Sequence, residues 1–260
     1  MFTGERVIAK PNNELYQKSL KRYQFCCCLL KPHHQFLDIS CGTGYGSLLL
    51  ARYAKKVIGV DVDPDLILTH QKQNCNPKIT FKLTKPETLD SSLINKFDVI
   101  VSLETIEHCL NQKLFLTHLK HYVKQNGTII ISTPNNYRRL HPPTNRYHHR
   151  EYHVLDLFGV LKKLFSYSSI HIYGQGQTSY SNNPPIPNPQ PLEYLVKYLF
   201  SAIYNFDLRY THLLEHINHL SVYQKIGHLQ GYSDDLIYPI DPTSFFHPTT
   251  AIFVINQIKK

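Results

Sequence analysis

The chain has 260 residues, of which 42% are apolar, so it can form one large α/β domain or a core domain that carries an insertion. No apolar run approaches the ~18–20 residues that span a bilayer, and the first residues lack the charged-then-apolar pattern of a signal peptide. The net charge of +9 comes from scattered bases, which favours a solvated surface over a nucleic-acid footprint and leaves an anionic substrate or a membrane surface open. The six cysteines form no C-x-x-C pair and are typical of a reduced, cytoplasmic enzyme.

The first 34 residues predict a helical segment ahead of the first strand. Asn13 is a candidate N-cap for a helix from about Glu14 to Leu30, because the apolar residues of this stretch recur at helical spacing. Residues 1–34 are therefore expected to form a helical cover, with an ordinary packing helix as the alternative.

A glycine-rich stretch follows the first predicted strand. The apolar run that ends at Asp38 is typical of a buried parallel strand. Gly42, Gly44 and Gly46 come directly after it, and glycines let a ligand approach the backbone closely. The helix predicted over residues 47–53 begins at this turn, so its free N–H groups point at the same place. Strand, turn and helix together predict a cradle for a nucleotide-like cofactor.

The second predicted strand ends in Asp61, which lies 19 positions after Gly42. A carboxylate at this place can accept hydrogen bonds from two ribose hydroxyls, which both dinucleotides and S-adenosylmethionine carry. The dinucleotide pattern G-x-G-x-x-G would place a third glycine where this chain has Ser47. With Asp38 and Cys41, the observed G-x-G-x-G pattern resembles motif I of class I S-adenosylmethionine-dependent methyltransferases.

This resemblance implies an α/β fold with a Rossmann-like seven-stranded sheet of order 3-2-1-4-5-7-6, whose last strand is antiparallel and whose two faces carry helices. It also implies S-adenosylmethionine as the cofactor. In relatives, a segment like the N-terminal one often folds over that cofactor. At the positions that match the family's motifs, the expected cofactor-binding residues are Asp38, Ser40, Cys41, Gly42, Gly44, Asp61, Val62, Glu87, Leu103 and Glu104.

The third predicted strand, residues 79–83, follows a helix over residues 64–75 that Asp63 is expected to cap. In the family the next loop usually carries Gly-Asp, whose Asp contacts the adenine amino group. Lys85 stands in place of that Asp, so backbone groups around residues 85–87 are expected to recognise the adenine instead.

The fourth predicted strand, residues 97–102, leads into Leu-Glu-Thr-Ile-Glu-His, which ends at His108 and resembles motif IV of the family. At the carboxyl end of a central strand, Glu104 and His108 would lie near the transferable methyl group. Alternatively, His108 only supports the loop through a hydrogen bond. A helix over 113–124 and a strand over 128–132 continue the β-α alternation, which argues for a parallel sheet.

Two polar segments follow the fifth strand, at residues 133–136 and 145–152, and resemble a signature of the same methyltransferase branch, with arginine in place of its usual proline. His148 aligns with the family histidine. Because imidazole has a near-neutral pKa, His148 is the first candidate general base and His108 the second. The positions expected to contact the substrate are Asn135, Asn145, His149 and Tyr152. His148 lies near a second histidine and a glutamate, but no other ligand has a supporting motif, so no metal is expected.

The last part of the chain predicts an insertion before the final strand. The core is expected to comprise residues 1–173 and 249–260, and the Pro- and Tyr-rich insertion residues 174–248. A proline-rich connector and two amphipathic helical stretches predict a mainly helical insertion. It is expected to cap the acceptor pocket; a homodimer surface and a membrane-contacting patch are the alternatives.

The expected function is methyl transfer from S-adenosylmethionine, most simply to an oxygen of a small molecule or glycan precursor. An RNA or protein methyltransferase is the alternative, since the positive charge favours it. A non-catalytic binding module that keeps the cofactor fold is a second alternative. The fold alone does not fix the acceptor.

Overall fold

The computed structural model describes residues 10, 12–29, 31–136, 143, 145–176, 237–239 and 249–259. Most of the expected insertion, residues 174–248, therefore lies outside the described residues, as do its proline-rich connector and both helices expected there. The helical character of this insertion and its roles as cap, dimer surface or membrane patch stay predictions.

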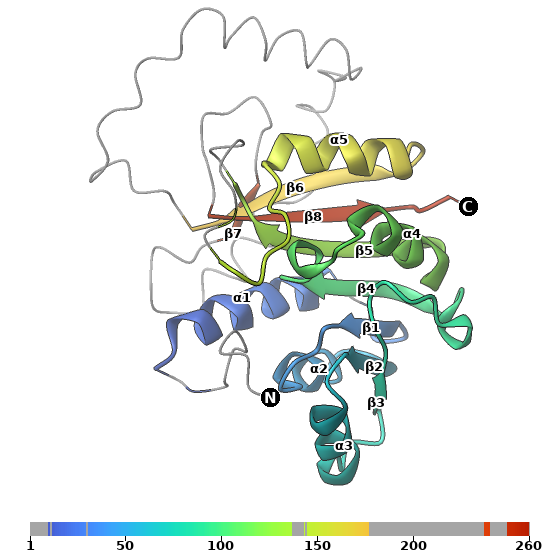
Figure 1. Ribbon diagram of the computed structural model, residues 1–260. Helices are drawn as coiled ribbons and strands as arrows, with labels where there is room; N and C mark the ends of the chain where they lie inside the picture. Colours follow the sequence, from blue (N-terminus) through green and yellow to red (C-terminus); the bar gives the residue numbers. More distant parts are fainter. Residues whose placement is uncertain are drawn as a thin grey trace, which may run out of the picture.

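One mixed sheet forms the centre of the described structure, with strand order β3-β2-β1-β4-β5-β8-β6-β7 (Figure 1). Strands β1 to β5 pair in parallel, and β8 lies antiparallel between β5 and β6. This confirms the predicted seven-stranded arrangement; the short β7, from within the expected insertion, extends the sheet by pairing with β6. The strands are β1 (Gln35–Ile39), β2 (Lys56–Asp61), β3 (Ile79–Leu83), β4 (Phe97–Leu103), β5 (Val123–Pro134), β6 (Ser169–Gln175), β7 (Ile237–Pro239) and β8 (Thr250–Asn256).

Helices begin largely where their caps predict. Asn13 caps α1 by accepting the N–H of Tyr16 at 3.2 Å, and Asp63 caps α3 in the same way. In the described part of the chain, no helix has both the length and the apolar character needed to cross a membrane. The helices are α1 (Glu14–Cys28), α2 (Tyr45–Leu50), α3 (Pro64–Gln73), α4 (Gln112–Tyr122) and α5 (Val154–Leu164), with short 3₁₀ turns η1 (Ser91–Leu93) and η2 (Ile106–His108).

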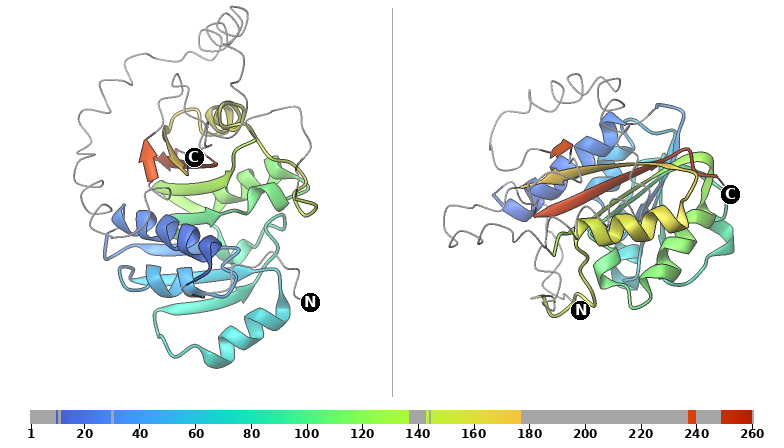
Figure 2. Two further views of the ribbon diagram at one scale, coloured as in Figure 1. Left: turned by 90° about the vertical axis from the view of Figure 1, so that its left-hand side faces the viewer. Right: turned by 90° about the horizontal axis from the view of Figure 1, so that it is seen from above.

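The two faces of the sheet carry separate hydrophobic cores, because side chains alternate along each strand. Ile130 of β5 packs in the core that includes α1, α2 and α3. Its neighbours Ile129 and Ile131 pack in the other core, with α4 and α5. Figure 2 shows α1 and α5 on opposite faces of the sheet, so the expectation of helices on both faces is confirmed.

Parallel pairing brings the carboxyl ends of β1, β2 and β4 to one edge of the sheet. Ile39 of β1 pairs with Val60 of β2 on one side and with Ser102 of β4 on the other. The loop after β1, residues 40–44, which we call the glycine loop, therefore begins beside the segment that follows β4. Ligands of open α/β sheets bind at this edge.

Candidate active site

Asp38 is fully buried near the end of β1 and is engaged within the chain. Its Oδ1 accepts a hydrogen bond from the Tyr23 hydroxyl at 3.0 Å, and its Oδ2 accepts one from the Ser47 hydroxyl at 2.6 Å. Burial raises the pKa of Asp38 to about 7, against the effect of these two hydrogen bonds. Asp38 therefore joins α1 and α2, and the direct cofactor contact expected from the sequence stays a prediction.

Asp61 and Gly42 meet where β2 ends beside the glycine loop. Oδ2 of Asp61 accepts the N–H of Gly42 at 2.9 Å, and Oδ1 accepts the N–H of Asp63 at 3.1 Å. Gly42 has a φ of +53°, and no heavy atom lies within 4 Å of where a Cβ would stand. The loop thus leaves open space beside a carboxylate, which fits a cofactor whose ribose hydroxyls bind Asp61.

The rest of the glycine loop is fixed by backbone geometry and by α3. Ser40 adopts a φ of 58°, and Gly44 one of 79°. Cys41 is buried. From α3, Nε2 of His70 lies 2.8 Å from the carbonyl oxygen of Gly42. The backbone conformation at Ser40 and Gly44 and the contact of His70 with the Gly42 carbonyl thus fix the path of the loop. A cofactor bound there would meet mainly backbone groups.

The remaining expected cofactor residues differ in exposure. Val62 is half exposed beside Asp61, whereas Leu103 is buried at the end of β4. The Glu87 carboxylate accepts the N–H of Asn111, just before α4. Lys85 is exposed on the same loop. Glu87 therefore joins the loop after β3 to the start of α4, and a contact with the adenine stays a prediction.

Helix α1 packs directly on the start of α2. A Cβ at Gly46 would lie 2.0 Å from Cζ of Tyr23, so only glycine permits this approach. The Tyr45 hydroxyl donates to Oγ of Ser19 at 2.6 Å across the same contact. The third glycine of G-x-G-x-G is thus explained by helix packing.

Arg22 of α1 is a buried positive charge that the sequence analysis missed. Its side chain donates to Oε1 of Gln175 at 2.7 Å, and among the described residues Nε has no hydrogen-bond partner. Burying a guanidinium carries a desolvation cost. The signal available in the sequence was an arginine within the predicted N-terminal helix. Its contact with Gln175 of β6, which is distant in sequence, could not be predicted.

Glu104 follows β4 in a backbone conformation that is uncommon for a residue with a side chain, with a φ of 51°. Ser132 on the neighbouring β5 fixes it: its Oγ donates to Oε1 of Glu104 at 2.7 Å, and its carbonyl accepts the N–H of Glu104 at 3.0 Å. Strained residues of this kind cluster at functional sites.

Glu107 lies one turn further on, and its side chain is only 1% exposed. Oε2 accepts a hydrogen bond from the Thr133 hydroxyl at 2.9 Å, but among the described residues no group donates to Oε1. Burial, and next the charge of Glu104, raises the pKa of Glu107 well above its usual value. Sequence reasoning did not select Glu107, although the Glu-x-x-Glu-His pattern contains it.

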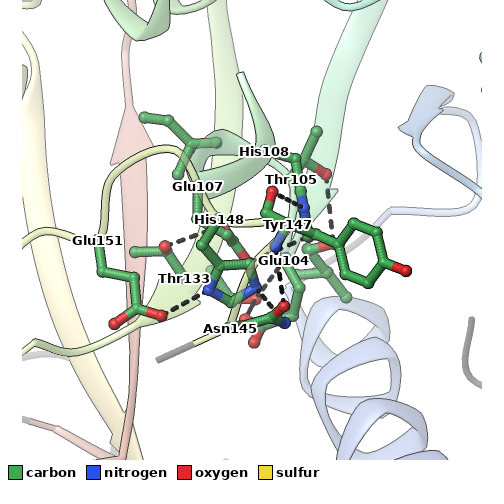
Figure 3. Close-up of polar contacts among 12 residues, drawn as sticks. Glu104, Thr105, Glu107, His108, Thr133, Asn145, Tyr147, His148 and Glu151 are labelled. Carbon is green, nitrogen blue, oxygen red and sulfur yellow. Dashed lines mark hydrogen bonds and ion pairs between the residues drawn. The ribbon is translucent and has the colours of Figure 1, made fainter. Parts of the chain in front are cut away.

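The rings of His108 and His148 meet beside Glu107, with centroids 4.7 Å apart (Figure 3). Nδ1 of His108 lies 3.2 Å from the carbonyl oxygen of Tyr147, and Nδ1 of His148 lies 2.5 Å from Oε1 of Glu151. Both partners accept hydrogen bonds, so each neutral ring carries its proton on Nδ1 and its lone pair on Nε2. We call Glu107, His108, His148 and Glu151 the histidine–glutamate centre.

Two of the expected substrate residues lie at this centre. The amide nitrogen of Asn145 is 3.0 Å from Nε2 of His148, and its oxygen accepts the N–H of Tyr147. His149 has an exposed side chain, and its N–H donates to the carbonyl of Glu107 at 2.8 Å. The segment from 145 to 151 is therefore tied to the turn after β4.

The other two expected substrate residues have structural partners. Oδ1 of Asn135 accepts the N–H of Val154 at 2.9 Å, at the start of α5. Tyr152 is buried in the α5-side core, and the Arg150 guanidinium lies over its ring at 4.4 Å. Asn135 and Tyr152 therefore help to hold this segment against α5, and their contact with the substrate stays a prediction.

Comparison with known proteins agrees with this geometry. A family model described as a methyltransferase domain matches residues 12–171. A probable S-adenosylmethionine-dependent methyltransferase of Mycobacterium tuberculosis is 29% identical over 169 residues, which cover 62% of this chain and 59% of that protein. The match thus spans less than two thirds of that relative's length. A ubiquinone biosynthesis O-methyltransferase of Pelagibacter ubique is 34% identical over 104 residues, 39% of this chain and 42% of that protein.

Solved structures share the fold. A crystal structure of an S-adenosylmethionine-dependent methyltransferase from Archaeoglobus fulgidus matches with a TM-score of 0.55 and 18% identity, and covers 94% of this chain and 93% of that chain. Because the family model covers more than half of the chain and the glycine loop, Asp61 and the sheet order all agree with it, the chain belongs to the methyltransferase-domain family of class I S-adenosylmethionine-dependent methyltransferases.

Proposed function

We propose that this chain transfers a methyl group from S-adenosylmethionine to a hydroxyl oxygen of a small molecule or glycan precursor. The observation that carries the proposal is the histidine–glutamate centre at the carboxyl edge of the sheet. Two imidazoles with their Nδ1 atoms fixed lie one strand away from the glycine loop. The naming of the Pelagibacter relative as an O-methyltransferase supports the same class of acceptor, over the part of the chain that it matches.

The chain's own residues would hold the cofactor through complementary groups. S-adenosylmethionine supplies the methyl group on a sulfonium, already activated for displacement. Asp61 would accept hydrogen bonds from the ribose hydroxyls, and the open space at Gly42 would admit the nucleoside. Arg22, which is buried, would provide a positive charge for the carboxylate of the cofactor's amino-acid part. Alignment of donor and acceptor can contribute roughly 7–11 kcal/mol to the lowering of the barrier.

A hydroxyl acceptor must also lose its proton, because a neutral hydroxyl is a weak nucleophile. An electron pair of the acceptor oxygen forms the new C–O bond, the pair of the broken C–S bond stays on sulfur, and the hydroxyl proton leaves. That proton would pass to Nε2 of His148, the first candidate base, with His108 as the second candidate base. Glu151 would stabilise the resulting imidazolium through Nδ1.

The test is a methyl-transfer assay against hydroxylated small molecules and against the same molecules with the hydroxyl blocked. We expect transfer to the free hydroxyl alone, and a loss of about 10²–10⁴-fold in turnover for His148→Ala with unchanged S-adenosylmethionine affinity. His121→Ala is the matched control, because His121 is an exposed histidine near the opposite edge of the sheet.

Two other outcomes would contradict the proposal. Transfer to RNA, with binding that weakens steeply as salt rises, would establish the nucleic-acid alternative. Failure of the wild-type chain to bind S-adenosylmethionine at all would favour a non-catalytic binding module.

A further inference from the structure

Three donor atoms of the histidine–glutamate centre converge on one point. Glu107, His108 and His148 each offer one ligand atom, and these atoms lie within 4.8 Å of one another. Glu107 and His108 come from η2 after β4, whereas His148 comes from a segment forty residues later. Figure 3 shows the three side chains directed toward one another from these two segments.

The tautomers of the two rings leave lone pairs at this point. Nδ1 of His108 faces a carbonyl oxygen and Nδ1 of His148 faces the Glu151 carboxylate, so both Nδ1 atoms carry hydrogen. A histidine that binds a metal through Nε2 donates its other N–H to a carbonyl or a carboxylate in the same way. Both rings therefore already have the outer hydrogen bonds that a metal ligand needs.

Of these three ligand atoms, Oε1 of Glu107 is the one that has no donor among the described residues, whereas Nε2 of His148 lies 3.0 Å from the amide nitrogen of Asn145. Oε1 of Glu107 lies 4.0 Å from Nε2 of His108, which is too far for a hydrogen bond. That oxygen is buried and has no hydrogen-bond partner among the described residues, while Thr133 holds the other oxygen in place. An oriented, buried carboxylate oxygen that faces two ring lone pairs is explained by a cation that binds all three.

We propose that Glu107, His108 and His148 bind a divalent transition-metal ion. Two imidazole nitrogens and one carboxylate oxygen suit Zn²⁺, Mn²⁺ or Co²⁺ better than Mg²⁺ or Ca²⁺, which prefer oxygen ligands. Three protein ligands leave at least one coordination position for another molecule. The His108 side chain is 35% exposed, so the site can be reached from solvent. This inference revises the expectation that the chain binds no metal.

The catalytic role of the ion rests on the proposed function, but its binding does not. An acceptor hydroxyl that reaches the open position becomes more acidic and is held in place. With the ion bound, Nε2 of His148 would bind the metal in place of its hydrogen bond with Asn145. His148 would then not act as the base, and the hydroxyl proton would pass to solvent. Glu151 is then a positioning residue that orients the His148 ring.

Metal binding can be measured without any acceptor. The full chain is treated with a chelator and dialysed, and Mn²⁺, Co²⁺, Zn²⁺, Mg²⁺ and Ca²⁺ are titrated separately by calorimetry. We expect one equivalent of each transition ion, with affinities more than about 10-fold above that of Mg²⁺. Co²⁺ should also develop visible absorption bands typical of nitrogen and oxygen ligands. S-adenosylmethionine is titrated into the same preparation as an independent measurement.

Substitutions locate the ion. Glu107→Gln and His148→Ala should each weaken Co²⁺ binding by more than about 100-fold, and Glu151→Gln by about 10–100-fold, as for an outer-sphere partner. His121→Ala should bind Co²⁺ like the wild type. Circular dichroism and thermal unfolding check that each variant folds; if Glu107→Gln does not fold, His108→Gln serves in its place.

The outcomes separate the ion from the reaction. If the wild type binds S-adenosylmethionine but no transition ion, or if binding is unaffected by Glu107→Gln and His148→Ala, the metal site is wrong and the proposed function stands. If the ion binds at these residues while S-adenosylmethionine does not bind, the metal site stands and the proposed function fails.

Discussion

The glycine loop and the histidine–glutamate centre lie at the same edge of the sheet but differ in how their polar groups are satisfied. Around the glycine loop, both oxygens of Asp38 and both oxygens of Asp61 accept hydrogen bonds from within the chain. In the histidine–glutamate centre, a buried oxygen of Glu107 has no such partner among the described residues.

This difference indicates two ways of preparing a site. The glycine loop is held in shape by its own hydrogen bonds, so a cofactor would meet a preformed surface. The histidine–glutamate centre is held in shape at its periphery, by Thr133, Tyr147 and Glu151, and it contains a buried Glu107 oxygen that has no hydrogen-bond partner among the described residues. Such a centre gains stability when a positive charge binds.

The largest effect should come from Asp38, which links stability to pH. Its pKa rises from 3.8 to about 7 in the folded chain because it is buried. Between these pH values the folded state holds more protons than the unfolded state, so stability falls as pH rises from about 4 to 7, by roughly 4 kcal/mol in total. Urea unfolding at about pH 5 and pH 8 should show roughly 3 kcal/mol of this fall, because part of it already occurs below pH 5, and Asp38→Asn should reduce it. An equal pH dependence in wild type and variant would show that Asp38 titrates normally.

Asp61 tests whether the preformed surface is the cofactor site. Asp61→Ala removes a charged acceptor for ribose hydroxyls and should weaken S-adenosylmethionine binding by about 100-fold, roughly 3 kcal/mol. Calorimetric titration with the cofactor and its demethylated product measures the change. Asp65→Ala is the control, because Asp65 is exposed on α3. Equal losses in the two variants would mean that general charge, rather than this contact, governs binding.

Gly46 tests the packing of the cover helix on that surface. In Gly46→Ala the new methyl would overlap the Tyr23 ring, so the free energy of unfolding should fall by about 1–3 kcal/mol. Denaturant unfolding measures it. In a Tyr23→Ala background the same substitution should cost much less, since the overlapping ring is gone. If Gly46→Ala lowers the free energy of unfolding equally in both backgrounds, the loss does not come from overlap with the Tyr23 ring.

Thr133 gives the smallest effect and tests the histidine–glutamate centre. Thr133→Val keeps the shape but removes the hydrogen bond to Glu107, and we expect a loss of about 1 kcal/mol in stability. Thr117→Val, which removes a hydrogen bond on α4 near the surface, is the control. The difference between these variants should change when Co²⁺ is present, because the ion would fix the same carboxylate. A difference that is independent of Co²⁺ would argue that the ion does not touch Glu107.

The parts that sequence predicted are those encoded by local patterns. The β-α alternation and the resemblance of motif I gave the sheet order, and Asn13 and Asp63 marked two helix starts through their own side chains. The positions of Gly42 and Asp61 at the ends of neighbouring strands were also predictable, since glycine spacing and an acid at the strand end carry the signal.

The parts that it missed depend on contacts between distant segments. Glu107 contacts Thr133 of β5 and the backbone of His149, and Arg22 donates to Gln175 of β6. The hydrogen bonds of Asp38 with Tyr23 and Ser47 join three different elements, so the sequence could not predict them. The three-residue β7 carries too short a pattern to be predicted, because its pairing with β6 is set by the tertiary structure.

The pairing of β6 with β7 also bears on how this chain can change over evolutionary time. Gln175 and Ile237 are direct partners, so these two positions lie side by side in the sheet although they are far apart in the sequence. Residues between these two points can be added, removed or replaced without shifting the register of the other strands, because closing a longer loop between fixed ends costs little. Descendants of one ancestral sheet could therefore acquire different intervening segments while the edge that carries Asp61 and Glu107 is inherited unchanged.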